Sequence, residues 1–427
     1  MTARLNMLLY AMLLTAHQYH AIASKIRLYP SGEQSLHNRL NKRSHTNMEG
    51  GPTLCYKIKV NVENTTLMVD LDTGSADLII PLKGLNDYSG PTVNRVFDPS
   101  QRKTKIEYMD NSAGQGYGFI GSVSLTRTSV FSSDAPIVGI AEQSIDSPLI
   151  GRYKDQGLLG LAYASAANYK PKQGTVLDAW HNSGTMAKNQ FAFHACPYDK
   201  IDQSYIDFGN SEPVSKCGSS TEPNVWTKSP STSLITMKLS AIYIDDTSIE
   251  LPRMFQSGVK IEDWAVIDTC TTVMTLPKNI VLALQEKIRS SGGLPSGLTL
   301  EKSNDLLSGN MALSSNNLFN WDKLPKLTFE ARSDETNSGS VVSTFNITLS
   351  ARQYFRANSK GDTEFAISIG SDEAALLGTP FLTNLRIVVD RDRFRVGFSL
   401  GCGCETSPDG YPTIKTSNGK IWSSGSA

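Results

Sequence analysis

The sequence predicts a mostly β protein built from two related lobes. Many short apolar runs lie between turn-forming residues, and Gly and Pro are spread along the 427-residue chain, which is typical of β structure. Two strand-like runs end in nearly the same way, at Asp72-Thr73-Gly74-Ser75 and at Asp268-Thr269-Cys270-Thr271. An apolar strand that delivers a carboxylate into a loop of hydroxyls is uncommon. Its occurrence in both halves predicts two lobes that each contribute one carboxylate to a shared site.

The charge and hydropathy of the chain argue against several classes of partner. Its 41 basic and 41 acidic residues balance, so we expect no net field that would favour nucleic acid or an anionic membrane. No internal apolar segment approaches the roughly 20 residues that span a bilayer. The sequence shows no additional interaction element either, so we expect a monomer.

The first 23 residues have the pattern of a secretory signal peptide. Arg4 precedes the apolar run 5–14, and Ala21-Ile22-Ala23 offers a small-residue cleavage site. A buried N-terminal helix is the alternative interpretation. Removal of residues 1–23 would place the protein outside the cell or in a vacuole, with its six cysteines in an oxidising compartment.

A short polar and basic segment, residues 24–43, follows and ends in Lys42-Arg43. This dibasic pair lies between a predicted signal peptide and the first strand-like run. It therefore predicts a processing site that releases a mature chain beginning at Ser44. A solvated charged pair is the alternative. We expect a zymogen whose pro-segment spans residues 24–43.

The first lobe is expected to span residues 44–225. Apolar residues alternate with polar ones from Leu54 to Val62, as in a half-buried strand. A nearly all-apolar run from Leu67 to Leu71 then leads into Asp72. A carboxylate at the end of a strand buried on both faces is costly unless it is hydrogen-bonded or paired. The tight turn and hydroxyls that follow therefore predict a carboxylate held by its own loop.

The second lobe is expected to span residues 226–427, because the strand-like pattern restarts there after a polar run. Each half contains an Asp-Thr loop and, later, a hydrophobic residue followed by Gly, at Leu159-Gly160 and Leu377-Gly378. The two halves thus look like one unit used twice. The best helix candidate is residues 282–289, which carry Lys and Arg in the last turn.

The motifs of the chain, taken in order, resemble those of the pepsin-like aspartic proteases over essentially the whole predicted mature chain. Besides the two Asp-Thr loops, the resemblance is carried by Leu78-Ile79-Ile80-Pro81, Phe97-Asp98-Pro99-Ser100, Ile106-Glu107-Tyr108, the Gly-rich turn up to Gly121, Gly157-Leu158-Leu159-Gly160-Leu161-Ala162, Leu376-Leu377-Gly378, Phe381-Leu382-Thr383-Asn384, Val388-Val389-Asp390 and Arg395-Val396-Gly397-Phe398. The predicted signal peptide, short pro-segment and dibasic site are similar to those of the secreted fungal members. The resemblance implies a bilobal fold with the active-site cleft between two β lobes.

For the two loops, the resemblance implies an aspartic endopeptidase site without cofactor or metal. Asp72 and Asp268 match the two carboxylates that share a proton and a water in this family. Two carboxylates about 3 Å apart cannot both ionise. One then acts as general base toward the water, while the protonated one polarises the scissile carbonyl. An acidic optimum and an extended peptide or protein substrate follow from this chemistry.

The neighbours of the two carboxylates are assigned by the same resemblance. Thr73 and Thr269 match the threonines that join the two loops beneath the carboxylates. Ser75 and Thr271 match the hydroxyls that bond the outer carboxylate oxygens. Gly74 matches the glycine that allows the tight turn of the first loop.

The flap of the family is matched by residues 106–123, a Gly-rich stretch between two strand-like runs. Tyr108 stands where the family places the flap tyrosine, and a half-buried strand aromatic is the alternative interpretation. The chain departs from the family pattern at three positions here and behind the loops. Ile79 stands where Trp is frequent, Met109 where Gly is usual, and Thr379 where Asp is usual.

Cys270 is the departure that bears most on activity, because family members usually carry Gly there. If the position requires a positive φ, a cysteine is strained by about 1 kcal/mol or more. If φ is negative, Cys270 is a small apolar packing residue. This residue supports the alternative function, a catalytically silent pepsin-like protein that binds a peptide or partner in its cleft.

The remaining cysteines are candidates for disulfides. Cys196 and Cys217 flank an apparent hairpin and form one candidate pair. The resemblance brings the ends of the mature chain together, so Cys55 is expected to pair with Cys402 or Cys404, which would leave the cysteine of the second loop free. Zinc is the competing use of cysteines, but the six are scattered and no His is clustered with them.

Two N-glycosylation sequons accompany the predicted secretion. They are Asn64-Thr65-Thr66 and Asn346-Ile347-Thr348. Such tripeptides also arise by chance.

Overall fold

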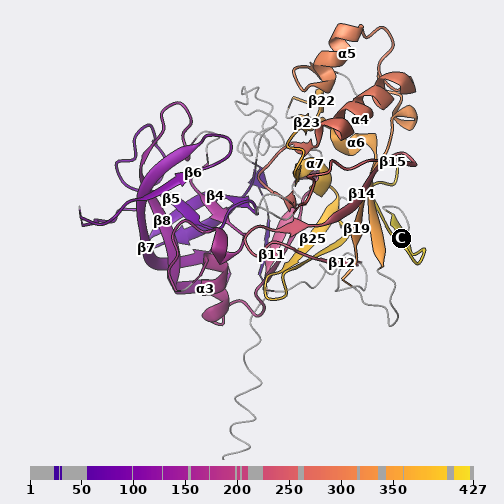
Figure 1. Cartoon of the computed structure of the whole chain (residues 1–427). Helices are drawn as coiled ribbons and strands as arrows, with labels where there is room; N and C mark the ends of the chain where they lie inside the picture. The colour runs from indigo at the N-terminus through magenta and orange to yellow at the C-terminus, as the bar shows by residue number, and fades with distance from the viewer. Residues whose placement is uncertain are drawn as a thin grey trace, which may run out of the picture.

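The structure, a computed structural model, describes residues 24–27, 29–30 and 55–423, with gaps of one to three residues and longer gaps at 210–224, 258–263, 335–342 and 402–407. Figure 1 shows two bodies of β structure side by side. Most of the first half of the chain (indigo to magenta) lies in one, and most of the second half (orange to yellow) lies in the other. The predicted bilobal, mostly β fold is therefore confirmed.

The first lobe is built on one large sheet. Its strands are β2 (Tyr29–Pro30), β3 (Tyr56–Val62), β4 (Thr65–Asp72), β5 (Leu78–Pro81), β6 (Thr104–Glu107), β7 (Ala113–Leu125), β8 (Phe131–Gln143) and β9 (Leu158–Gly160). They are ordered β2-β3-β4-β9-β5-β8-β7-β6. All of β5 is buried, as its apolar sequence requires, and the second half of β4 is buried together with its two aspartates, Asp70 and Asp72.

The described part of the second lobe forms three sheets. Its strands are β13 (Thr236–Met237), β14 (Leu239–Ile244), β15 (Thr247–Ile249), β16 (Ala265–Ile267), β17 (Met274–Leu276), β18 (Ala312–Leu313), β19 (Leu327–Arg332), β20 (Thr344–Leu349), β21 (Phe355–Ala357), β22 (Thr363–Phe365), β23 (Ile367–Ile369), β24 (Ala375–Leu377), β27 (Thr413–Thr416) and β28 (Ile421–Ser423). The orders are β13-β16-β24-β17-β23, β15-β14-β19-β20-β27-β28 and β18-β22-β21. The first of these sheets carries the second Asp-Thr loop.

The strands around the two Asp-Thr loops repeat one local topology. In the first lobe β4 is parallel to β9, β9 is antiparallel to β5, and β5 is parallel to β8. In the second lobe β16 is parallel to β24, β24 is antiparallel to β17, and β17 is parallel to β23. One structural unit therefore occurs twice, with an aspartate at the end of its leading strand each time.

A further sheet joins the two lobes. Its strands are β1 (Ser24–Arg27), β10 (Gln190–His194), β11 (Tyr205–Phe208), β12 (Val225–Lys228), β25 (Leu385–Asp390) and β26 (Arg395–Leu400), in the order β1-β11-β10-β25-β26-β12. The central pairing is antiparallel, between β10 of the first half and β25 of the second. Most of these strands are buried, so the lobes share one continuous hydrogen-bonded layer.

Two short strands come from the predicted pro-segment. β1 is the edge strand of the joining sheet, next to β11, and β2 pairs with β3 at the edge of the first-lobe sheet. The rest of residues 24–43, the predicted signal peptide and Ser44 lie outside the described residues. The predictions about processing therefore stay predictions.

The described helices are short except for one. They are α3 (Val176–Asn182), α4 (Lys278–Ser291), α5 (Leu300–Leu307), α6 (Ala351–Tyr354) and α7 (Thr379–Leu382), with 3-10 turns at Ala164–Ala166 and Trp321–Lys323. The predicted helix 282–289 is the central part of α4, which starts after Pro277 and ends at Gly292 with a φ of 71°. Its apolar side chains Ile280, Leu284 and Ile288 are buried.

The core consists mainly of one apolar cluster that runs through both lobes. A smaller cluster around Ile79, Ile106 and Val138 lies in the first lobe, against the hairpin formed by β6 and β7. Among the described helices, none has the length and apolarity needed to cross a membrane.

Candidate active site

Both Asp-Thr loops begin where a buried strand ends. Asp72 is the last residue of β4, and Asp268 follows directly after β16. In each lobe the strand with the hydrophobic-Gly pair lies parallel beside the leading strand, with Asp72 opposite Gly160 and Ile267 opposite Leu377. The two carboxylates therefore leave their sheets in equivalent surroundings.

Thr73 and Thr269 join the two loops by reciprocal hydrogen bonds. The N–H of Thr73 donates to Oγ1 of Thr269 (3.1 Å), and the N–H of Thr269 donates to Oγ1 of Thr73 (2.9 Å). Each hydroxyl in turn donates to a carbonyl of the other lobe, Thr73 to Ile267 (2.7 Å) and Thr269 to Leu71 (2.8 Å). Both threonines are buried, so water does not compete for these bonds. The bonds fix the position of one loop relative to the other.

The carboxylate of Asp72 is held by its own loop. Its Oδ1 accepts a hydrogen bond from the N–H of Gly74 (2.8 Å), and its Oδ2 accepts one from the hydroxyl of Ser75 (2.5 Å). Asp72 and Ser75 are both buried. Gly74 and Ser75 therefore both donate hydrogen bonds to Asp72, the first of the two predicted catalytic carboxylates.

The carboxylate of Asp268 has the same set of donors and one more. Its Oδ1 accepts from the N–H groups of Cys270 (2.8 Å) and Thr271 (3.1 Å). Its Oδ2 accepts from the Thr271 hydroxyl (2.8 Å). The N–H of Cys270 therefore does for Asp268 what the N–H of Gly74 does for Asp72.

The two carboxylates face one small space. A β-carbon placed on Gly74 would lie 2.8 Å from Oδ2 of Asp268 and 3.1 Å from Oδ1 of Asp72. Burial raises the pKa of Asp72 well above its ordinary value, and the charge of Asp268 raises it further. Like charges at this separation favour a state in which the pair holds one proton. Such a pair can serve as acid and base at the same time.

The chain passes directly behind each loop at a hydrophobic-Gly segment. A β-carbon on Gly378 would lie 2.1 Å from the carbonyl oxygen of Val273 and 2.3 Å from that of Thr271. A β-carbon on Gly160 would lie 2.5 Å from the backbone of Ala76. Only glycine fits at these two crossings, which explains why the sequence repeats the motif.

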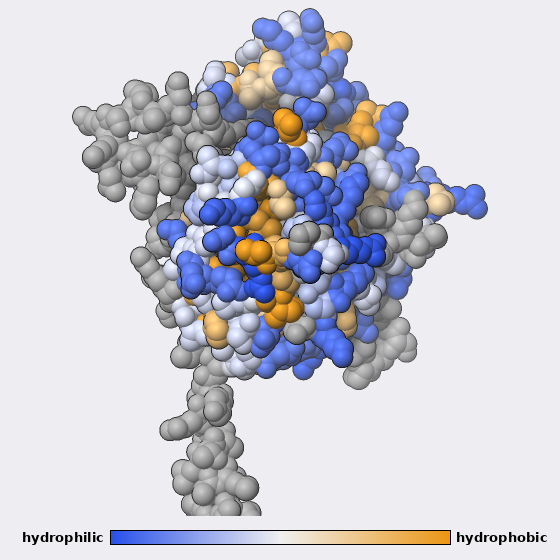
Figure 2. Space-filling model, turned by 90° about the vertical axis from the view of Figure 1, so that its left-hand side faces the viewer, coloured by the Kyte–Doolittle hydropathy of each residue, from blue (hydrophilic) through white to orange (hydrophobic). Residues whose placement is uncertain are grey.

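The predicted flap is an antiparallel hairpin of β6 and β7. Tyr108 enters its turn, where its N–H donates to the Ser112 carbonyl (2.9 Å) and its carbonyl accepts from the Asn111 N–H (3.0 Å). Met109 lies in this turn with 91% of its surface exposed. Figure 2 views the molecule from the side of the first lobe and shows apolar residues gathered near the middle of a largely hydrophilic face.

The side chain of Tyr108 lies over the first carboxylate loop. Burial holds the pKa of its phenol well above the ordinary value, and the charge of Asp72 acts in the same direction. The Ser75 hydroxyl lies near the phenolic oxygen and acts on its pKa in the opposite direction, although within the described part of the chain no group meets full hydrogen-bond geometry with this oxygen. Ile79, which stands where Trp is frequent in the family, is fully buried and offers no side-chain donor. Tyr108 is therefore held by apolar packing against the small cluster that contains Ile79.

Cys270 forms a disulfide with Cys55, with a Cα–Cα distance of 4.5 Å. The expectation that Cys55 pairs with Cys402 or Cys404 is therefore wrong, and so is the expectation of a free Cys270. The prediction considered only the chain ends, whereas the residue just before β3 lies beside the second loop. Cys270 is not among the residues with positive φ, so its side chain imposes no backbone strain.

The other predicted modification sites are a second disulfide and two glycosylation sequons. Cys196 is disulfide-bonded, but its predicted partner Cys217 lies outside the described residues. Asn64 is exposed in the turn between β3 and β4, and Asn346 is partly buried on β20. Glycosylation of either asparagine stays a prediction.

Thr379, which stands where the family usually has Asp, links an arginine to the second loop. Its hydroxyl accepts from the guanidinium of Arg356 (2.7 Å) and donates to the carbonyl of Thr272 (3.0 Å). Its N–H donates to the carbonyl of Thr271 (2.8 Å). The substitution therefore keeps a polar connection to the backbone behind Asp268.

A buried ion pair beside the first loop was not predicted. Nζ of Lys57 lies 3.1 Å from Oδ1 of Asp70, and their side chains are 3% and 11% exposed. The two residues are register partners on β3 and β4. Burial raises the pKa of Asp70 to about 7, although the charge of Lys57 opposes the shift. The sequence signal for this ion pair was Asp70 itself, which interrupts the apolar run 67–71.

Asp77 is a second buried carboxylate that the sequence analysis did not single out. It accepts hydrogen bonds from the N–H and side-chain amide of Asn168 (2.8 and 3.0 Å) and from the N–H of Tyr169 (3.2 Å). Burial raises its pKa above the ordinary value. Asp77 therefore fastens the segment after the hydrophobic-Gly crossing to the end of the first loop.

One cluster of potential metal ligands adjoins the site. Ligand atoms of Cys55, Asp70 and Cys270 lie within 4.8 Å of one another. Both sulfurs are joined in the disulfide, and Asp70 is paired with Lys57. The oxidised protein therefore offers no thiolate pair to a metal here.

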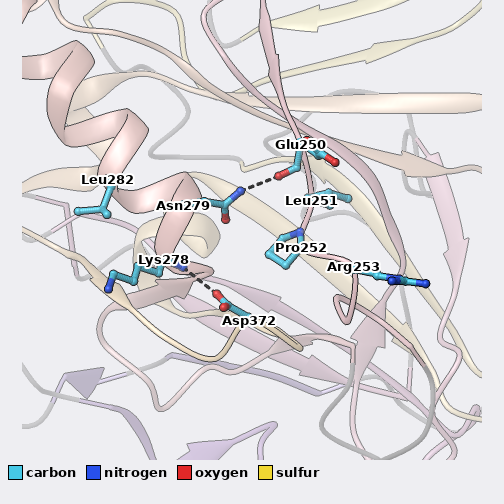
Figure 3. Close-up of a pocket in the computed structure, with 8 residues that line it drawn as sticks. All are labelled: Glu250, Leu251, Pro252, Arg253, Lys278, Asn279, Leu282 and Asp372. Atoms are coloured by element: carbon cyan, nitrogen blue, oxygen red, sulfur yellow. Dashed lines mark hydrogen bonds between the residues drawn. The ribbon is translucent and has the colours of Figure 1, made fainter.

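A surface hollow of about 410 Å³ lies in the second lobe (Figure 3). It is lined by Glu250, Leu251, Pro252, Arg253, Lys278, Asn279, Leu282 and Asp372. The side chain of Asn279 bonds the Glu250 carbonyl (2.7 Å), and the N–H of Lys278 bonds Asp372 (3.2 Å). Both signs of charge line the hollow and neither Asp-Thr loop reaches it, so we do not assign the active site to it.

Comparison with known proteins agrees with this geometry. A family model described as "Eukaryotic aspartyl protease" matches residues 55–400. Penicillopepsin-2 of Penicillium janthinellum is 32% identical over 133 residues, which cover 28% of this chain and 31% of that protein. Aspergillopepsin-1 of Aspergillus flavus and that of Aspergillus oryzae are each 35% identical over 124 residues, covering 28% and 30%. The matched segment thus spans less than a third of the length of each of these relatives.

Proposed function

Because the chain belongs to the eukaryotic aspartyl protease family, we propose that it is an aspartic endopeptidase that hydrolyses peptide bonds with water activated by Asp72 and Asp268. The observation that supports this most is the paired geometry of the two loops. Each carboxylate is bonded by an N–H and a hydroxyl of its own loop, and Thr73 and Thr269 join the loops reciprocally.

The proposed mechanism uses one proton on the pair. The ionised carboxyl removes a proton from the water, while the protonated carboxyl donates to the oxygen of the scissile carbonyl. Collapse of the tetrahedral intermediate then transfers a proton to the leaving nitrogen. The pair titrates as a unit, so neither role is assigned to one aspartate. The loop donors hold the ionised form in place, since hydrogen bonds to a carboxylate favour its charge.

The proposed substrate is an extended peptide or a protein segment bound between the lobes. The hairpin of β6 and β7 supports this, because its turn exposes Met109 and carries Tyr108 beside Asp72, where a bound peptide would lie. Backbone hydrogen bonds would hold the peptide, and pockets for alternate side chains would select it. Tyr108 would then pack against the substrate next to Asp72.

The proposed setting is extracellular or vacuolar, with the enzyme made as a zymogen. The signal-peptide pattern of residues 1–23 and the dibasic Lys42-Arg43 support this. N-terminal sequencing of the secreted protein should give Ser44 as the first residue. A mature protein that begins at Ser24 would contradict the processing step.

A catalytically silent binding protein remains the second candidate. Its main support was the replacement of the usual glycine by Cys270. In the structure, however, the N–H of Cys270 bonds Asp268 at the same 2.8 Å as the N–H of Gly74 bonds Asp72. The enzyme is therefore the better supported candidate.

The test is proteolysis of a denatured protein between about pH 3 and 6, with and without a statine-type transition-state inhibitor. We expect cleavage that the inhibitor abolishes. Asp72→Asn and Asp268→Asn should each lose activity by at least about 1,000-fold, because either change removes the acid–base pair. Asp134→Asn, at an exposed position on β8, is the matched control and should cleave like the parent. Absence of inhibitor-sensitive cleavage, with the inhibitor still bound, would favour the silent binding protein.

A further inference from the structure

The disulfide between Cys55 and Cys270 connects the two halves of the candidate site. Cys55 directly precedes β3, which pairs along its length with β4, the strand that ends at Asp72. Cys270 lies 215 residues later, in the loop of Asp268. The bond therefore ties the strand pair of the first carboxylate to the loop of the second, alongside the hydrogen bonds of the two threonines.

Cys270 is itself part of the support of Asp268. Its N–H is one of two backbone donors to Oδ1 of that carboxylate, at 2.8 Å, and the N–H of Thr271 is the other, at 3.1 Å. A displacement of Cys270 would therefore lengthen a bond to the carboxylate directly. The carboxylate and the disulfide share the same short loop.

The first loop shows why a side chain at this position needs an anchor. A β-carbon on Gly74 would lie 2.8 Å from Oδ2 of Asp268, closer than non-bonded carbon and oxygen atoms approach. In the second loop the corresponding residue carries a side chain, and that side chain is bonded to Cys55. The disulfide thus fixes the orientation of the Cys270 side chain, so this side chain does not disturb the loop of Asp268.

The surroundings of the disulfide suit thiol–disulfide exchange. Cys270 is partly exposed, while Cys55 is nearly buried. An oxygen of Asp70 lies within 4.8 Å of both sulfurs, and Asp70 is paired with the buried ammonium of Lys57. An attacking thiolate therefore reaches the sulfur of the partly exposed Cys270 more readily than that of Cys55.

We propose that Cys55 and Cys270 are positioning residues whose disulfide holds Asp268 in its working geometry and makes activity dependent on redox state. This inference rests on the proposed function. A dithiol would reduce the bond: its thiolate attacks one sulfur, the mixed disulfide is resolved by its second thiol, and the products are two protein thiols and a cyclic disulfide. The freed loop then holds the carboxylate less firmly.

The expected effect is on the chemical step rather than on substrate binding. Asp72 faces Asp268 across the site, Tyr108 lies beside Asp72, and the ion pair of Asp70 and Lys57 lies beside the sulfurs. The two aspartates titrate as a unit, and loss of a donor makes the ionised form of the pair less favourable, so the acidic limb of the pH profile should move to higher pH. We expect kcat to fall by about 10-fold, with KM changed by less than about 2-fold.

The experiment compares the mature protein before and after treatment with dithiothreitol at neutral pH. Exchange is then quenched by assay at acidic pH, and alkylation with mass spectrometry reports the state of Cys55 and Cys270. The Cys55→Ala/Cys270→Ala variant should match the reduced parent and should not respond to the reductant, which separates this bond from any other disulfide. Cys55→Ala/Cys270→Gly should regain activity, because glycine provides the N–H without a side chain.

Each outcome decides between this inference and its competitors. If the parent is active and complete reduction of this bond leaves kcat and the pH profile unchanged, the inference is overturned while the proposed function stands. If activity is lost together with the circular-dichroism signal of the folded protein, the bond is merely structural and the inference also fails. If the oxidised parent neither cleaves protein nor binds a statine-type inhibitor, the proposed function itself fails.

Discussion

Gly74 and Cys270 donate equivalent backbone hydrogen bonds, although only Cys270 carries a side chain. Both donate an N–H to the aspartate two residues earlier at 2.8 Å. At Gly74 the space that a side chain would fill is occupied by the carboxylate of the other lobe, whereas Cys270 is tied to Cys55. The pair of loops is therefore symmetrical in its hydrogen bonds and asymmetrical in its packing.

Gly74→Ala should consequently abolish most activity. The added methyl would lie 2.8 Å from Oδ2 of Asp268, so the carboxylate or the loop must move. We expect kcat/KM to fall by at least about 100-fold, since a small displacement of a catalytic group is enough for such a loss. Measurement of kcat/KM and of the melting temperature separates this effect from unfolding. An alanine variant with parental kcat/KM would contradict the placement of the two carboxylates.

At the level of residues, the aspartates and their hydroxyl neighbours could be predicted because they are adjacent in sequence. Asp72 with Ser75, and Asp268 with Thr271, form bonds that span three positions. The partner of Cys270 could not be predicted in this way. A disulfide over 215 residues depends on a Cα–Cα distance that only the tertiary structure sets.

The same limit applies to the ion pair of Lys57 and Asp70. Each residue is visible as a charge within a strand-like run, but their pairing depends on the register of β3 against β4. Register is a property of two strands together, and the alternation of one strand does not define it.

The topology could be predicted as a repeat because both halves carry the same motifs in the same order.

At the level of elements, the two loops form one unit through Thr73 and Thr269. Their four hydrogen bonds run between elements of opposite lobes and are buried. The unit depends on the two hydroxyls, because each of them both accepts from an N–H and donates to a carbonyl.

Thr73→Val should therefore weaken both stability and catalysis. Valine has nearly the shape of threonine but leaves the Thr269 N–H and the Ile267 carbonyl without a partner. We expect a loss of about 2–4 kcal/mol in the free energy of unfolding, from denaturant titration, and a lower kcat. Thr73→Ser keeps the hydroxyl and is the matched control, with most of both properties retained. Equal behaviour of the two variants would show that the hydroxyl is not what joins the loops.

The flap provides a second prediction at the level of elements. The phenolic oxygen of Tyr108 is buried, and within the described part of the chain only the nearby Ser75 hydroxyl offsets part of its desolvation. Tyr108→Phe should leave the protein as stable as the parent or more stable by up to about 1 kcal/mol, measured by thermal unfolding. Tyr108→Ala should lose the ring that packs against Ile79 and should lower stability and kcat/KM. Strong destabilisation by Tyr108→Phe would reveal a hydrogen bond to the hydroxyl.

At the level of the whole molecule, the joining sheet and the loop unit connect the lobes at two places. β10 and β25 pair across the lobes in one layer, and the threonines and the disulfide do so beside the carboxylates. Buried carboxyl groups lie around the second connection, namely Asp70, Asp72 and Asp77, and burial raises the pKa of each. The stability of the molecule is therefore linked to pH.

Stability should fall as the pH rises from about 4 to about 7. The ordinary pKa of an aspartate side chain is 3.8, whereas the pKa of Asp70 in the folded protein is about 7. Between these values the folded protein keeps a proton that the unfolded chain releases, so raising the pH favours unfolding, by up to about 1.4 kcal/mol per pH unit for this group. Urea titration at several pH values measures the slope. Asp70→Asn keeps an acceptor oxygen beside Lys57 but has no carboxyl proton to lose, so its slope should be shallower than that of the parent. The exposed Asp134→Asn should keep the parental slope, and an unchanged slope in Asp70→Asn would show that Asp70 does not hold the proton.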